Sequence, residues 1–228
     1  RSNAILLGGN SNVSSSVDNL GEIVSDNNGI LVFGDLFRFI NSGSLNAANN
    51  GVSGNSDADR ALISNTGTIL AGSDGIRLGG GSHQITNDGN ISVTSNAISV
   101  GTSGQATAGF NRITNTGTLN SEAGLGVNSG GGRSTILNTG EITANTGGIS
   151  ATGRVSPSSE QGIHLITNEG EITSSGFGMR VGGTDNAITN TGLINTEGIA
   201  NQQTGDGRLS NTRTITSQAN AIAILDQN

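Results

Sequence analysis

Aliphatic residues recur at fixed offsets along this chain, separated by polar residues and glycine. The segment Ile113–Leu119 (Ile-Thr-Asn-Thr-Gly-Thr-Leu) has aliphatic residues at its first and seventh positions, asparagine at the third and glycine at the fifth. Nine edited copies occur, with their asparagines at Asn19, Asn41, Asn65, Asn87, Asn115, Asn138, Asn168, Asn190 and Asn211. Successive asparagines are 21 to 30 residues apart, most often 22. This period, with a few longer exceptions, is typical of a solenoid with loops inserted into some coils.

Each repeat contains a second apolar element after its Asn-x-Gly. A small residue is followed by an aliphatic residue, any residue and another apolar residue, as in Gly75–Leu78 and Gly178–Val181. Gly51-Val52 and Gly198-Ile199 are weaker forms of the same element. Alternation over so few residues predicts a short strand with one buried face.

One coil can then be described in order. A strand ends in Ile-x-Asn, and the chain bends at Asn-x-Gly, where we expect glycine to supply a positive φ. A second strand follows, then the Gly-Ile-x-Val strand, and a variable loop leads to the next coil. The sequence predicts an all-β parallel β-helix of about nine coils, each with roughly 22 residues and three short strands. With coils about 4.8 Å apart, the rod is roughly 43 Å long.

We expect residues 5–228 to form a single β-helix domain, part of a longer protein, and treat residues 1–4 as a cloning remnant. The repeat asparagines stack in one column, for which two arrangements are open. The side-chain amides form a ladder from coil to coil, as in cross-β assemblies, or each asparagine bonds within its own turn. The column is structural in both cases.

Composition restricts the function. The chain has 38 glycines, no cysteine and a net charge of −7. An acidic chain lacks the basic stripe of a nucleic-acid binder, and a chain without cysteine has neither disulfides nor a thiolate metal site. We expect no cofactor and no bound metal, because His83 and His164 lie about three coils apart.

Catalysis would require converging carboxylates. Glu141 and Glu171 occupy the same repeat position in consecutive coils, with Glu169 nearby. Glycoside hydrolysis uses two carboxyl groups about 5–9 Å apart. The equivalent positions in other coils hold ordinary solvent-facing residues, and the chain has no tryptophan or tyrosine to form a sugar platform. We therefore interpret these glutamates as a solvated acidic patch and expect the protein not to be an enzyme.

Two long loops, Gly101–Arg112 and Thr152–Leu165, leave the same corner of the predicted helix. Insertions on one edge of a solenoid often build its binding surface, although they can also be tolerated decoration. The candidate contact residues are Gly101, Gln105, Phe110, Arg112, Arg154, Pro157, Glu160 and His164.

The Ile-Thr-Asn-Thr-Gly-Thr-Ile phrase, its Gly-Ile-x-Val partner and the richness in Gly, Ser, Thr and Asn resemble the β-helical passenger domains of bacterial autotransporters, the type V secretion family. The resemblance spans about residues 17–225 and concerns the scaffold, so it transfers no site residue. It implies a right-handed helix, export across the outer membrane of a Gram-negative cell, and display at the surface or release. It also implies that the full-length protein is anchored by a membrane barrel.

These observations favour a surface-exposed or secreted adhesion or self-association module with no catalysis. Its partner would be a host surface glycan or protein, or another copy of the chain. The alternatives are a passive stalk that holds a missing tip domain and a carbohydrate-active β-helix enzyme.

Overall fold

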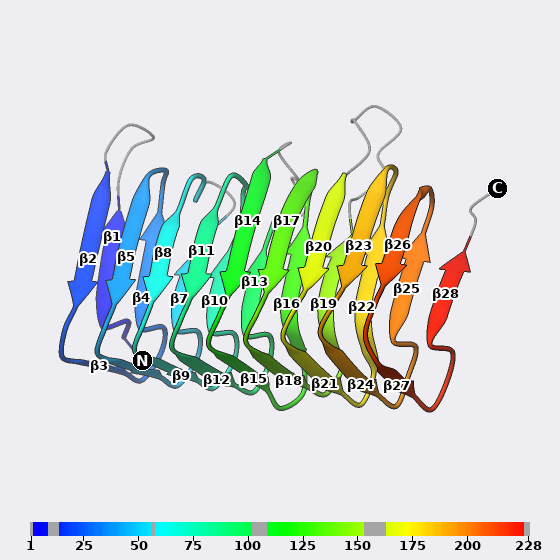
Figure 1. Ribbon diagram of the computed structural model, residues 1–228. Coiled ribbons are helices and arrows are strands. Elements are labelled where there is room, and N and C mark those ends of the chain that lie inside the picture. Colours follow the sequence, from blue (N-terminus) through cyan, green and yellow to red (C-terminus); the bar gives the residue numbers. More distant parts are fainter. Residues whose placement is uncertain (1, 9–13, 56–57, 102–108, 153–162, 226–228) are drawn as a thin grey trace.

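The chain folds into a solenoid of three parallel β-sheets. A computed structural model describes residues 2–8, 14–55, 58–101, 109–152 and 163–225. These residues contain 28 strands and no helix, and the chain advances steadily from one end of a rod to the other (Figure 1). The predicted fold class, with about nine coils of three short strands, is confirmed. No helix in the described part of the chain is long and apolar enough to cross a membrane.

Each strand from β1 to β25 pairs with the strand three places further along the chain, which produces one sheet for each side of the coil. Sheet A contains β1 (Ile5–Gly8), β4 (Ile30–Phe33), β7 (Val52–Gly54), β10 (Ile76–Leu78), β13 (Ile98–Val100), β16 (Leu125–Gly130), β19 (Gly147–Thr152), β22 (Phe177–Gly182), β25 (Asn201–Thr204) and β28 (Ile222–Leu225). Sheet B contains β2 (Ser15–Asn19), β5 (Phe37–Asn41), β8 (Leu62–Asn65), β11 (Gln84–Asn87), β14 (Phe110–Asn115), β17 (Arg133–Asn138), β20 (His164–Asn168), β23 (Asn186–Asn190) and β26 (Gly207–Asn211). Sheet C contains β3 (Glu22–Ser25), β6 (Ser44–Ala47), β9 (Thr68–Ala71), β12 (Asn90–Val93), β15 (Thr118–Ser121), β18 (Glu141–Ala144), β21 (Glu171–Ser174), β24 (Leu193–Thr196) and β27 (Ile215–Ser217).

The register places equivalent repeat residues directly on one another. Ile85 pairs with Ile63 on one side and with Ile113 on the other, and Ile91 pairs with Ile69 and Leu119. All of these side chains are fully buried. The core is therefore a narrow stack of aliphatic columns, and a one-residue slip of a strand would turn its aliphatic residues outward.

The glycines of Asn-x-Gly serve a different purpose from the one predicted. Their φ angles are not positive, so conformational freedom is not what the bend requires. A Cβ at Gly117 would instead lie 2.0 Å from the carbonyl oxygen of Gly89 in the preceding coil. Equivalent contacts of 2.0–2.1 Å recur at Gly43, Gly67, Gly89, Gly140, Gly170 and Gly192. The column is glycine because the coils approach too closely there for any side chain.

The weak element Gly198-Ile199 was assigned wrongly. Strand β25 begins at Asn201, which pairs with Met179, and the carbonyl of Ala200 lies against Gly178. Ala200 therefore takes the small-residue position, and the two inward positions that follow hold Asn201 and Gln203, both fully buried. The predicted element lies at the nearest aliphatic residue, Ile199, whereas the strand register begins two residues further on.

Replacing Gly117 with alanine should lower stability by about 1–3 kcal/mol, because the added methyl group must push two coils apart. The matched control is Gly21→Ala, at the same repeat position but with nothing within 4 Å of the added Cβ. Thermal unfolding followed by circular dichroism should show a Tm several degrees lower for the first variant and little change for the second. Equal effects would mean that backbone freedom, not coil contact, selects glycine.

Candidate functional site

The repeat asparagines form a continuous hydrogen-bonded ladder along the rod. Each side-chain Nδ2 from Asn19 to Asn190 donates to the Oδ1 of the asparagine in the next coil, at 2.6–2.8 Å. From Asn41 to Asn190 the same Nδ2 also donates to the carbonyl two residues ahead in its own turn, as Asn115 does to Gly117 at 3.1 Å. Both arrangements left open by the sequence thus occur together. Since Asn41 to Asn190 are buried and paired, the ladder is a structural element rather than a binding site.

A second polar ladder, which the repeat analysis missed, lies at the corner between sheets C and A. It contains Asn3, Asn28, Asn50, Asp74 and Asn96. Here each Oδ1 accepts a hydrogen bond from the next coil; Asn50 Nδ2, for example, donates to Asn28 at 2.9 Å. The signal in the sequence was Asn or Asp directly before the Gly-Ile element in the early coils. Because Asn3 begins this ladder, Ser2–Ala4 pack on the first coil.

A third polar column lies inside the corner between sheets A and B, beneath the variable loops. It contains His83, Asn111, Ser134, His164 and Asn186. His83 is satisfied: its Nδ1 accepts from the Ala61 N–H at 3.2 Å and its Nε2 donates to the Gly79 carbonyl at 2.6 Å. Those partners fix the neutral tautomer, and burial lowers the pKa of His83.

The C-terminal coils hold buried polar groups without hydrogen-bond partners, some in this column and some on the facing sheet A. Among the described residues, no hydrogen bond reaches either ring nitrogen of His164, the Nδ2 of Asn186, the side chain of Asn201 or the Oε1 of Gln203. His164 and Asn186 enter the interior from sheet B, and Asn201 and Gln203 enter from sheet A. Burial lowers the pKa of His164 to about 4, because the charged imidazolium loses its hydration there. Asn201 and Gln203 are polar at positions where the preceding strand of sheet A carries Met179 and Val181.

His164 is therefore not a surface contact residue, contrary to the prediction. It is the first residue of β20, and its side chain is fully buried. Phe110 and Arg112 also belong to a strand, β14, rather than to a loop, but both are exposed, Phe110 to 51%. Gly101 is buried with a φ of +65° at the end of β13.

The other candidates from the two long loops, Gln105, Arg154, Pro157 and Glu160, lie outside the described residues. The two loops connect sheet A to sheet B, at the corner lined inside by the third polar column.

The two glutamates weighed for catalysis stack as expected. Glu141 pairs in register with Glu171, and both are exposed on the outer face of sheet C. The Oε1 of Glu141 accepts a hydrogen bond from Thr143 at 3.3 Å. No group of three or more His, Cys, Asp or Glu side chains within the described ranges could hold a metal ion.

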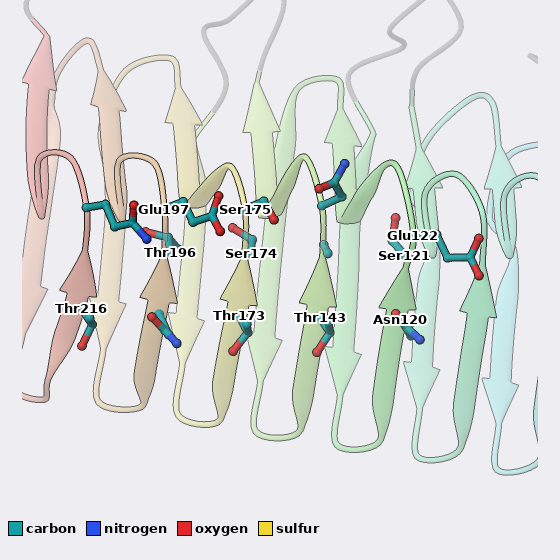
Figure 2. Close-up of a pocket in the computed structure, with 14 residues that line it drawn as sticks. Asn120, Ser121, Glu122, Thr143, Thr173, Ser174, Ser175, Thr196, Glu197 and Thr216 are labelled. Atoms are coloured by element: carbon teal, nitrogen blue, oxygen red, sulfur yellow. The ribbon is translucent and has the colours of Figure 1, made fainter.

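The outer surface is hollowed beside sheet C. A groove of about 430 Å³ runs across the last five strands of this sheet and the turns that leave them. Its floor is a row of outward residues in register on successive strands: Asn120, Thr143, Thr173, Asn195 and Thr216. Figure 2 shows the labelled members of this row side by side, with Glu122, Ser175 and Glu197 at the turns above them. Sequence reasoning missed this groove because the row contains ordinary strand residues.

Comparison of the chain with protein-family models, with curated proteins and with solved structures gives no match. The class of protein is defined by the fold, a three-sheet parallel β-helix. Such a scaffold serves binding, support and catalysis alike, so function has to be argued from the surface that it presents.

The pH dependence of stability should reflect the protonation of His164. Its folded pKa lies below the unfolded value near 6.5, so the folded state binds fewer protons and stability is lost as pH falls from 6.5 towards 4. The loss between pH 6.5 and 5 should be on the order of 2 kcal/mol, with a further share from His83. Thermal unfolding of His164→Leu across this range should show a shallower slope, while Leu165→His, which adds an exposed histidine, should leave the slope unchanged. Identical slopes for wild type and His164→Leu would contradict this prediction.

Restoring aliphatic residues on β25 should stabilise the protein. Asn201→Ile with Gln203→Val copies the residue types of the paired strands, which carry Met179 and Val181 on one side and Ile222 and Ile224 on the other. The substitutions remove the unpaired side chain of Asn201 and the unpaired Oε1 of Gln203, and lose only the long hydrogen bond that Gln203 Nε2 donates to Gly205 at 3.3 Å. The net effect should be a gain of about 1–3 kcal/mol, seen as a higher Tm. Gln202→Val, which points outward on the same strand, is the control and should give no increase. A fall in Tm in the double variant would show that these groups are satisfied in solution.

Proposed function

We propose that this protein is a surface-exposed adhesion or self-association module that acts through side-on contacts of a rigid rod and performs no catalysis. The observation that carries the proposal is the open polar groove along sheet C. It crosses five coils and is lined by hydroxyl, amide and carboxylate groups. Such a surface offers many weak hydrogen bonds in a row rather than one deep pocket.

The rest of the fold supports this function. The coils pack in register around a continuous aliphatic core and two side-chain ladders, so equivalent outward residues repeat at the coil spacing of about 4.8 Å. A repetitive partner, either a surface polymer or a second copy, can then match several coils at once, and weak contacts add up. The exposed Phe110 and Arg112, where β14 emerges from a long loop, add a more specific contact.

The two alternative functions, a passive stalk and a carbohydrate-active enzyme, require different features of the surface. A passive stalk needs only a stable rod, and neither the groove nor the loops would then matter. A carbohydrate-active enzyme needs a carboxylate pair held in a defined environment, whereas Glu141 and Glu171 lie exposed on an open sheet face. The same proposal includes a location at the surface of a Gram-negative cell and secretion by the type V route, as part of an autotransporter passenger domain. These three points rest on the sequence resemblance.

The proposal is tested by displaying the full-length protein on bacteria and measuring cell aggregation and binding to host cells. One variant shortens loops 101–112 and 152–165 to the length of the loop at 182–187, and another fills the groove with Thr173→Arg and Asn195→Arg. Thr86→Arg with Thr114→Arg, on the outer face of sheet B, is the matched control. We expect at least one of the first two variants to reduce aggregation or host binding several-fold. Intact display with both properties unchanged in both variants would favour the stalk.

A further inference from the structure

The floor of the sheet C groove is free to bind. Thr143 donates to Glu141, but elsewhere in the described structure the side chains of Asn120, Thr173, Asn195 and Thr216 have no hydrogen-bond partner. The outward residues at the Asn-x-Gly corner differ, because several of them bond to the neighbouring coil, as Thr116 does to Asp88 at 2.6 Å. The groove row therefore presents donors and acceptors to solvent at every coil.

The chemistry of the row suits sugars better than peptides. Hydroxyl and amide side chains each donate and accept, as sugar hydroxyl groups do. The backbone groups of sheet C are already used between its own strands, so an extended peptide has no free sheet edge to join along this face. A linear glycan lying across the strands would meet the next polar side chain of the row about every 4.8 Å, which is close to the length of one sugar unit.

The charge of the groove restricts which kind of glycan can bind. Glu122 and Glu197 contribute carboxylates at the turns above the row, and none of the described residues that line the groove is Arg or Lys. The whole chain carries a net charge of −7. A uronic or sulfated polymer would be repelled, whereas a polymer with protonated amino groups would be attracted.

We infer that the sheet C groove binds an extended glycan that carries free amino groups, oriented along the rod axis. Its hydroxyl groups bond to the Asn and Thr row, and its ammonium groups pair with Glu122 and Glu197. This inference deepens the proposed adhesive function by naming the ligand of one surface, and it rests on that function for its biological meaning.

The test is calorimetric titration of the purified 228-residue protein with three probes: chitosan oligosaccharides, chitin oligosaccharides and oligogalacturonate. Chitosan and chitin share one backbone and differ in whether the amino groups are free or acetylated. We expect chitosan to bind best, chitin to bind about fivefold more weakly and oligogalacturonate not to bind. Added salt should reduce the affinity for chitosan and leave that for chitin unchanged.

Two pairs of substitutions locate the site. Glu122→Gln with Glu197→Gln should lower the affinity for chitosan about fivefold, to the level of chitin. Glu141→Gln with Glu171→Gln removes the same charge from the same sheet outside the groove lining and should have no effect. Thr173→Arg, which obstructs the floor, should abolish binding of both oligosaccharides. Circular dichroism confirms that each variant is folded.

Lack of chitosan binding, equal effects of the two glutamate pairs, or equal binding of oligogalacturonate would each overturn the inference. These results are separable from the test of the proposed function. Loss of glycan binding with cell adhesion intact would leave the adhesive function standing on another surface. Glycan binding without any contribution to adhesion would leave the groove as a glycan site in a protein that is not an adhesin.

Discussion

The hydrogen bond that each repeat asparagine donates to the next fixes how the coils sit on one another. Asn115 joins Asn87 and Asn138 in one buried chain of amides, and its Nδ2 also closes the turn at Gly117. An amide that is shifted out of this column loses its hydrogen-bond partners in both neighbouring coils, which is costly in an apolar interior. The aliphatic columns and the glycine contacts depend on this register, as does the polar row on the outside of sheet C.

The periodicity of the sequence predicted most of the fold because a solenoid repeats the same coil of three short strands. The spacing of Ile113, Asn115 and Leu119 and their copies was enough to give the strands, the columns and the parallel pairing. It was not enough to give the reason for Gly117, because a Cβ clash with Gly89 is a property of two stacked coils and not of one turn. It also misplaced β25, because residue identity at Asn201 and Gln203 contradicts the register that the neighbouring strands impose.

The candidate surface was harder to predict than the fold. His164 looked like a loop residue by its position after an insertion, yet strand β20 begins with it and turns it inward. The groove along sheet C contains Thr143, Thr173 and Asn195, residues that any solvent-facing strand would carry. Only the stacking of five strands makes them a continuous feature, so no local pattern in the sequence could single them out.

The glycine column also bears on how such a chain can change its length over time. Because Gly89 and Gly117 meet backbone to backbone, each coil presents nearly the same contact surface above and below. A copied or deleted segment of one repeat would still offer glycine to glycine and asparagine to asparagine at the new junction. Recombination within the gene can therefore lengthen or shorten the rod in whole coils, while loops and outer faces diverge separately in each copy.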